Sequence, residues 1–233
     1  MVNQPDDAIL TLKGVVQLLA LAIIGARARE LHRLCRNEVS AALKLGDDGL
    51  AIGVRWLAIK PSCSHCVTIE IVRKVMNVDW IGGVYAPPAV PRTPEMLAAL
   101  ALSETLIGEL VKADQVLICT PMYNYSIPAV LKSWIDYLVR PGFTFKLAPG
   151  WPGMLADKPT RILIATRDVH DPESEDDQVT PVIRRAFSFM DRRDVASLLA
   201  GGSLGVNRGE VRLEDHLARF EGAIAKAARG VAA

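Results

Sequence analysis

The chain has 233 residues, of which 50% are hydrophobic and 23% are charged, and its formal net charge is +1 at pH 7. This length is sufficient for one large α/β domain with a full core. The near-neutral charge gives no electrostatic argument for binding to nucleic acid or to an anionic membrane. Four cysteines do not form a disulfide framework in a chain of this size, so we expect the protein to be located in the reducing cytoplasm.

The first fifty residues are expected to form a helical extension of unknown role. Residues 14–26 are apolar, but they are fewer than the roughly 20 residues that a membrane-spanning helix needs. A signal peptide is the sharper alternative, because Ala26-Arg27-Ala28 resembles a cleavage site, but Asp6 and Asp7 give it the wrong amino-terminal charge. The break at residues 46–49 separates the extension, residues 1–50, from a main domain at residues 51–233.

The main domain has the pattern of an α/β fold. Helical segments alternate with short apolar runs that predict strands, at residues 54–59, 116–120, 161–166 and 195–200. This alternation predicts a doubly wound parallel sheet.

Capping residues and apolar stripes predict the helices. Thr93 suits an N-cap and Pro94 a first turn, for a helix that ends near Asp114. The next helix, beginning at Pro128, has two stripes, an apolar one of Leu131, Trp134, Ile135 and Leu138 and a polar one of Lys132, Asp136 and Arg140. Further helices are expected at residues 179–190 and from 213 onward, loops at 80–94 and 201–209, and an extended segment at 141–146.

The candidate site begins where the strand at residues 116–120 ends. Pro121 and Asn124 are turn formers, and Met122, Tyr123 and Tyr125 stand where a core does not need them. Open α/β sheets bind their ligands at the carboxyl ends of their strands. We therefore predict that residues 121–125 face a ligand rather than forming a plain strand–helix connection.

Residues 121–128, Pro-Met-Tyr-Asn-Tyr-Ser-Ile-Pro, are followed by Leu131-Lys132, Ile135-Asp136 and Gly142-Phe143-Thr144-Phe145. From about residue 80 to the C-terminus, the chain resembles the FMN-dependent NADH azoreductases, also described as FMN-dependent NADH:quinone oxidoreductases. The resemblance implies a flavodoxin-like fold, FMN as cofactor, NADH as co-substrate, and a homodimer with the site at its interface. It also implies a ping-pong reaction, in which hydride passes from NADH to flavin N5 and two electrons then pass to a quinone or azo compound.

The resemblance places the cofactor in three loops and requires neither a catalytic side chain nor a metal ion. The expected cofactor-binding residues are Pro121, Met122, Tyr123, Asn124 and Tyr125, then Thr166, Arg167, Asp168 and Val169, and finally Ser62 and Ser64. Among these, Asn124 is expected to make a polar contact with the ring system, and Tyr125 to pack beside the substrate.

The second of these loops departs from the family pattern. Similar enzymes have Ser-Arg-Gly-Gly where this chain has Thr166-Arg167-Asp168-Val169. A β-branched residue resists positive φ, and a carboxylate near the N1–C2 edge would disfavour the anionic reduced flavin. We therefore expect weakened or altered flavin binding here. His170 is either an acid or a solvated loop histidine, and Leu147 replaces a family tyrosine, which makes the substrate preference less transferable.

Residues 61–66 admit three interpretations. Ser62 and Ser64 suit a loop that holds the flavin phosphate after the first strand. Cys63 and Cys66 could instead form a redox or zinc element, although zinc would need a second pair of ligands. The third interpretation is an ordinary loop with buried thiols. Only residues 67–79 remain for the long helix and second strand that the family usually has next.

Two alternatives to the flavin oxidoreductase remain. A non-catalytic paralogue that keeps the fold but binds flavin weakly would agree with the divergent N-terminal third and with Asp168-Val169. A hydrolase is the weaker alternative, because the older family label of acyl-carrier-protein phosphodiesterase has no matching nucleophile or metal-site pattern in this sequence.

Overall fold

The computed structural model describes residues 58–60, 63–65, 76–87, 89–113, 116–171 and 174–223. The predicted extension at residues 1–50 lies outside these ranges, and so does Ser62 of the predicted phosphate loop.

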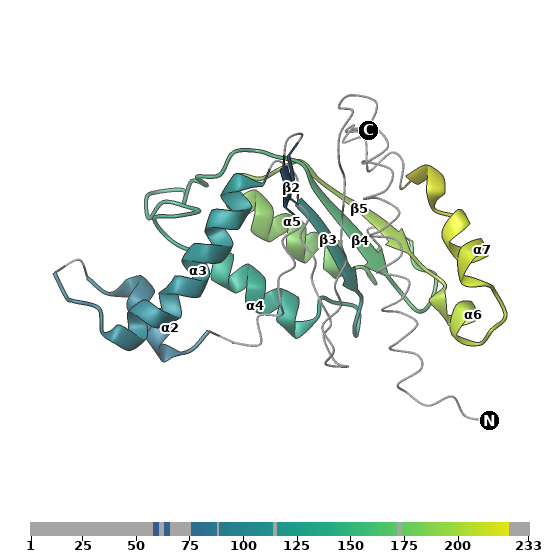
Figure 1. Ribbon diagram of the computed structural model, residues 1–233, viewed down its shortest axis with the longest axis horizontal. Coiled ribbons are helices and arrows are strands. Elements are labelled where there is room, and N and C mark those ends of the chain that lie inside the picture. The colour runs from purple at the N-terminus through teal and green to yellow at the C-terminus, as the bar shows by residue number, and fades with distance from the viewer. Residues whose placement is uncertain are drawn as a thin grey trace.

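A parallel sheet forms the centre of the described structure (Figure 1). Its strands are β3 (Val116–Pro121), β4 (Thr160–Ala165) and β5 (Val195–Ala200), in the spatial order β3-β4-β5. Pro121 pairs with Ala165, and Ala165 pairs with Ala200, so the three strands end at one level. These strands confirm the predictions to within one residue. β4 is buried along its whole length, as expected for a parallel strand covered on both faces.

β1 (Ala58–Lys60) and β2 (Cys63–His65) form a separate antiparallel pair. The expectation of a loop at residues 61–66 was therefore wrong for residues 63–65, which include Ser64. The short separation of β1 and β2 explains why the two strands pair antiparallel. Two residues are enough to connect antiparallel strands, whereas a parallel crossover needs a dozen or more.

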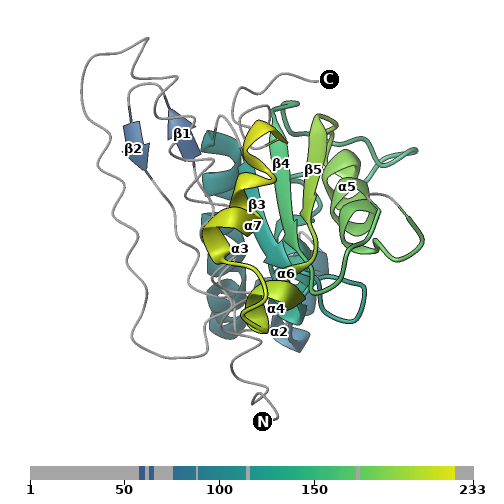
Figure 2. The same ribbon diagram turned by 90° about the vertical axis from the view of Figure 1, so that its right-hand side faces the viewer.

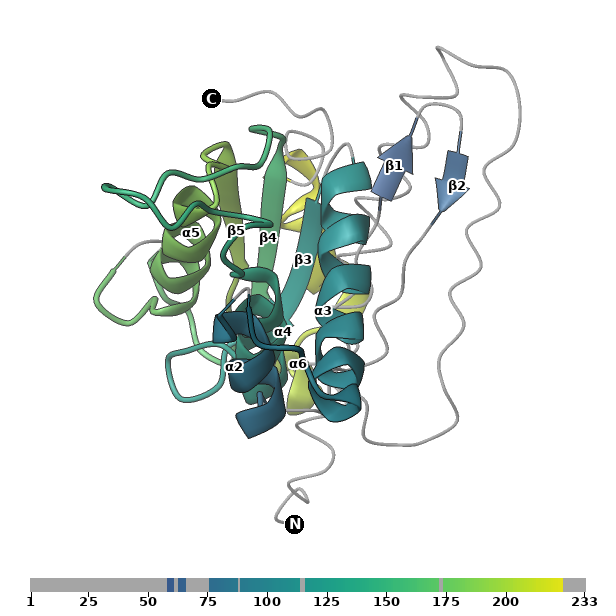
Figure 3. The same ribbon diagram turned by 90° about the vertical axis from the view of Figure 1, so that its left-hand side faces the viewer.

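Helices lie on both sides of the parallel sheet (Figures 2 and 3). α3 and α4 lie toward the viewer in Figure 3, and α6 and α7 lie toward the viewer in Figure 2. Their bounds are α2 (Val78–Tyr85), α3 (Pro94–Lys112), α4 (Ala129–Leu138), α5 (Val179–Phe189), α6 (Ser203–Asn207) and α7 (Leu213–Ala218). The predicted caps of α3 are confirmed, with Thr93 accepting from the Met96 amide and Pro94 in the first turn.

The predicted loop at residues 80–94 was wrong in its first part, where α2 forms. The Asn77 side chain caps this helix by accepting from the Trp80 amide at 2.9 Å. Gly83 belongs to helix packing and not to a loop, since a Cβ there would lie 3.0 Å from Leu100 Cδ1 of α3. Buried Trp80 meets the Tyr137 ring edge to face at 5.7 Å. The short helix α6 likewise corrects the predicted loop at residues 201–209.

The segment after α4 also differs from its prediction. Arg140 was expected on a polar stripe, but it is 4% exposed, with its guanidinium 4.0 Å from the centre of the Phe143 ring and 3.2 Å from Glu104. The predicted extended segment at 141–146 contains a turn, because Gly142 has φ +78° and donates to Phe145 O at 2.8 Å. The apolar stripe of α4 is buried as predicted.

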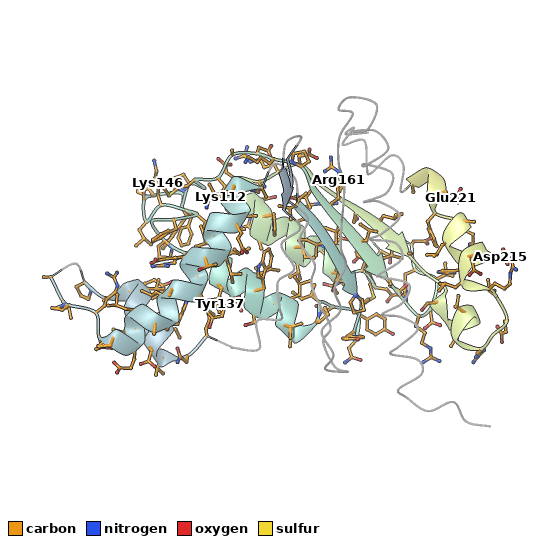
Figure 4. All side chains as sticks on the ribbon, viewed as in Figure 1. Lys112, Tyr137, Lys146, Arg161, Asp215 and Glu221 are labelled. Atoms are coloured by element: carbon orange, nitrogen blue, oxygen red, sulfur yellow. The ribbon has the colours of Figure 1, made fainter. Side chains whose placement is uncertain are left out.

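The amino edge of the sheet is held by charged side chains. Arg161 donates to Asp194 Oδ1 at 2.8 Å. Lys158 Nζ donates to Val111 O and Ala113 O at 3.0 and 2.8 Å, and Arg192 Nη2 donates to Leu110 O at 2.6 Å. Lys158 and Arg192 thus bind carbonyl groups at the C-terminal end of α3, where the helix dipole favours positive charge. Figure 4 labels Arg161 and Lys112 at this edge. No helix in the described ranges is long and apolar enough to cross a membrane.

Candidate functional site

The loop after β3 is a tight hairpin, which we call the β3 loop (residues 121–126). Tyr123 and Ser126 exchange backbone hydrogen bonds of 2.9 and 3.0 Å. The two residues between them, Asn124 and Tyr125, have φ of 48° and 66°. Two consecutive left-handed residues are the geometry of a type I′ turn. Asparagine tolerates this region, but tyrosine rarely adopts it, so the turn holds Tyr125 in an unfavourable conformation.

The β3 loop presents aromatic and polar groups to solvent. Tyr125 is 56% exposed and Asn124 is exposed, while Met122 and Tyr123 are half-buried. Burial raises the pKa of Tyr123, so its phenol stays protonated at neutral pH. Among the described residues, the amides of Asn124 and Tyr125 donate to no protein acceptor. The tip of the loop therefore offers two backbone donors beside an exposed ring.

The loop after β4, residues 166–170, is bound by the segment that follows β5, and we call it the β4 loop. Its carbonyl groups accept hydrogen bonds from the segment after β5: Thr166 O from Ser203 N (3.2 Å) and Ser203 Oγ (2.9 Å), Arg167 O from Leu204 N (3.0 Å), and Asp168 O from Gly202 N (3.2 Å). The buried Thr166 hydroxyl also donates to Asp168 O at 2.7 Å. Consequently the predicted cofactor residue Thr166 directs its side chain to its own loop.

The donors of the β4 loop are left free by this arrangement. Within the described ranges, no hydrogen bond is donated by the amides of residues 167–170. Arg167, Asp168 and Val169 are exposed, Val169 by 72%. Neither Asp168 nor Val169 has a positive φ. The loop therefore keeps a row of free amides without the left-handed geometry that a glycine pair would permit.

Contacts between side chains and backbone bring the two loops together. The Met122 amide donates to Ala165 O at 3.0 Å where β3 and β4 end. The rings of Tyr125 and His170 meet edge to face at 6.3 Å. His170 Nδ1 lies 3.5 Å from Asp176 Oδ2, and the backbone amide of Gln178 donates to Tyr125 O at 3.0 Å. One site therefore combines the ends of β3 and β4 with the segment before α5.

The structure unites two of the three predicted groups of site residues. Residues 121–125 and 166–169 adjoin at the carboxyl edge, whereas Ser64 belongs to the separate strand β2 and Ser62 lies outside the described ranges. Sequence reasoning missed Gly202, Ser203 and Gln178. The signal for the first two was the Gly-Gly-Ser sequence directly after the last strand, which was interpreted as a plain loop.

The site is suited to holding a ligand with several acceptor atoms. Free amides on two adjoining loops can bind the oxygen and nitrogen atoms of a planar ring, and the exposed aromatic can pack beside it. No cluster of three or more His, Cys, Asp or Glu suited to a metal ion is found in the part of the chain that the structure describes. The geometry therefore resembles a cradle for a cofactor more than an acid–base or nucleophile site.

Comparisons with known proteins identify relatives. A family model described as "Flavodoxin-like fold" matches residues 60–224. The FMN-dependent NADH:quinone oxidoreductase of Azotobacter vinelandii is 32% identical over 207 residues, covering 87% of this chain and 100% of that protein. The one from Acidobacterium capsulatum is 39% identical over 186 residues, covering 77% and 88%. FMN-dependent NADH:quinone oxidoreductase 2 of Cupriavidus pinatubonensis is 42% identical over 142 residues, but this alignment spans only 60% of this chain and 62% of that relative's length.

Solved structures agree on the fold. An azoreductase from Bacillus anthracis superposes with a TM-score of 0.66 at 23% identity, covering 93% of this chain and 92% of that one. Azoreductase AzrA superposes with a TM-score of 0.64, also at 23% identity and with the same coverage. The parallel sheet flanked by helices is thus the flavodoxin-like architecture that the sequence predicted.

Proposed function

The chain belongs to the FMN-dependent NADH:quinone oxidoreductase and azoreductase family, which has a flavodoxin-like fold, and from this premise we propose that it binds FMN and uses NADH to reduce a quinone or azo compound. When bound, FMN would supply the redox chemistry, taking hydride at N5 from NADH and passing two electrons to the acceptor in a ping-pong exchange.

One observation carries the proposal. Two loops that follow adjacent, in-register strands present backbone amides whose hydrogen bonds no described protein group accepts. The flavin ring system has carbonyl oxygens and ring nitrogens along one side, and amides are the donors that such atoms bind. Free amides at Asn124 and Tyr125 and at residues 167–170 therefore fit the flavin better than they fit a plain surface.

The side chains of the β3 loop would orient the cofactor and the substrate. Asn124 would make a polar contact with the ring system through its side-chain amide group. Met122 and Tyr123 are half-buried, and they would present an apolar surface against one edge of the ring. Because Tyr123 stays protonated, it adds no negative charge there. Tyr125 is exposed at the tip, where it would pack beside the acceptor.

Asp168 would tune the cofactor. Its exposed carboxylate lies on the β4 loop, whose free backbone amides would meet the pyrimidine edge of the flavin. A negative charge at that edge opposes the anionic reduced flavin and would lower its reduction potential. Arg167 supplies a neighbouring positive charge that would offset part of this effect.

A homodimer is part of the proposal. Val78, Ile81 and Tyr85 of α2 are 80%, 49% and 63% exposed, and their spacing places them on one face of the helix. An apolar helical face of this kind is typical of a surface that another protein covers. The cytoplasm is the proposed compartment, because the four cysteines suit a reducing environment.

Flavin binding and reduction form the test. The visible spectrum of the purified full chain would be recorded with and without added FMN, and then again after anaerobic addition of NADH. We expect a bound flavin that NADH bleaches and that a quinone restores. A protein that retains no flavin even at high FMN would contradict the proposal and favour the non-catalytic paralogue.

A charge variant sharpens this test. Asp168→Asn removes the carboxylate at nearly constant size, so we expect the midpoint potential of the bound flavin to rise. Glu175→Gln is the matched control, because it neutralises an exposed acid of the nearby segment before α5. Equal potentials in both variants would show that Asp168 does not face the flavin.

A further inference from the structure

The approach of two backbone segments at Gly201 is closer than a side chain permits. A Cβ built on Gly201 would lie 2.9 Å from Asp168 O, 3.1 Å from Val169 Cα and 3.2 Å from Thr166 Oγ1. Real Cβ atoms essentially never approach other heavy atoms to less than 3.0 Å. Two of these three atoms belong to the backbone of the β4 loop, so they cannot move aside as the end of a flexible side chain can.

Glycine is required at 201 for space and not for backbone conformation. Gly201 is absent from the residues with positive φ, whereas its neighbour Gly202 has φ +88°. An L-residue could therefore adopt the backbone of Gly201, but its Cβ would collide with the β4 loop. This distinguishes position 201 from Gly142, Gly150 and Gly209, where the backbone is left-handed and nothing lies within 4 Å of the added atom.

We infer that Gly201 is a positioning residue for the cofactor. Because it lacks a side chain, the β4 loop can take the conformation in which its carbonyl groups are bound and its backbone amides are free to meet the pyrimidine edge of the flavin. This inference rests on the proposed function. The β4 loop of this chain has Asp168 and Val169 and no glycine. Its backbone passes so close to the facing segment that Asp168 O and Val169 Cα lie within 3.1 Å of the position that a Cβ at 201 would take.

The hydrogen bonds around Asp168 O show what a side chain at 201 disturbs. This oxygen accepts from Thr166 Oγ1 at 2.7 Å and from Gly202 N at 3.2 Å, and the Cβ of an alanine at 201 would crowd it directly. Relief of the collision requires the loop to shift by several tenths of an ångström. That shift would turn the peptide group between Asp168 and Val169, and with it the Val169 amide.

Gly201→Ala is the first variant, with Gly108→Ala as its matched control. Gly108 lies in α3, where an added Cβ has nothing within 4 Å. FMN affinity would be measured by quenching of flavin fluorescence on titration with the full-length apoprotein. We expect Gly201→Ala to weaken FMN binding about tenfold, which corresponds to losing the alignment of one or two hydrogen bonds. The control should bind as the wild type does.

A second variant separates positioning from general damage to the fold. In the triple variant Gly201→Ala, Asp168→Gly, Val169→Gly, the β4 loop gains two glycines and can take a left-handed path away from the new Cβ. We expect FMN affinity to return to within about threefold of the wild type, since the amides can again be presented. The midpoint potential and the melting temperature of the apoprotein would be measured for every variant.

The outcomes distinguish this inference from the proposed function. A wild type that binds no FMN overturns both. A wild type and a Gly201→Ala variant of equal affinity overturn the inference alone. Should Gly201→Ala fail to fold, the triple variant decides: recovery of folding and FMN binding supports the inference, and recovery of folding without binding overturns it.

Discussion

The two loops of the candidate site lie side by side, but they differ in where most of their hydrogen bonds come from. The β3 loop is closed by its own residues, because Tyr123 and Ser126 bond to each other across Asn124 and Tyr125. The β4 loop has one bond of its own, from Thr166 Oγ1 to Asp168 O, and its other carbonyl partners come from residues 202–204, more than thirty positions later. The turn of the β3 loop is thus closed locally, with Met122 N and Tyr125 O bonded to Ala165 and Gln178, whereas the β4 loop depends mainly on a distant segment.

This difference determines where substitutions act. The conformation of the β3 loop should respond to changes within the loop itself, because its turn type restricts the residues at its tip. The β4 loop accommodates an acidic and a β-branched residue, because its backbone avoids positive φ there and its carbonyl groups are bound by the segment after β5. Substitutions in the segment after β5 should therefore affect it more than its own sequence suggests.

The largest effect on stability is expected at the tip of the β3 loop. Asn124→Val places a β-branched residue at φ 48°, and we expect it to lower the free energy of unfolding by about 1–2 kcal/mol in urea denaturation. Asn124→Gly is the control and should stay within about 0.5 kcal/mol of the wild type, because glycine adopts this region freely. Equal stability of the two variants would contradict the view that the turn type dictates this loop.

A smaller effect is expected behind the β4 loop. Ser203→Ala removes the 2.9 Å hydrogen bond from its buried hydroxyl to Thr166 O, and we expect a loss of about 1 kcal/mol in the free energy of unfolding. Ser188→Ala, in the half-buried part of α5, is the control and should be close to neutral. If Ser203→Ala were also neutral, the β4 loop would not depend on that hydroxyl.

The smallest change in stability is expected at Tyr125. Tyr125→Gly relieves a tyrosine at φ 66°, but glycine adds conformational entropy to the unfolded chain, so the free energy of unfolding should change by less than about 0.5 kcal/mol. Turnover of a quinone should nevertheless fall, with KM rising by a larger factor than kcat falls, because the exposed ring is proposed to pack beside the acceptor. A loss of stability well above that value would mean that the ring supports the fold instead.

Patterns within one element were predictable from the sequence. The strands β3, β4 and β5 are largely apolar runs, the caps of α3 are local, and the turn formers Pro121 and Asn124 mark the β3 loop. Contacts between distant segments were not predictable in this way. The pair Gly82-Gly83 was interpreted as a loop because its role, close packing of α2 on α3, involves residues that come later in the chain. Gly201 was missed for the same reason.

Arg140 shows a further limit of periodicity. Its position continues the polar stripe of α4, but the helix ends at Leu138, so the helical spacing no longer predicts which way this side chain points. The guanidinium then packs on the Phe143 ring and approaches Glu104, which pays part of the cost of burying a charge.

The side chains at the amino edge of the sheet also have a consequence for dynamics. Helix ends normally fray, but the last turn of α3 is tied by Lys158, just before β4, and by Arg192, just before β5. Local opening should therefore be rare at this edge and more frequent at the loops of the opposite edge. In hydrogen exchange, amides should be protected longest near the start of β4 and exchange fastest in residues 167–170. The molecule would then be rigid at one end of its sheet and adaptable at the other, where a ligand would enter.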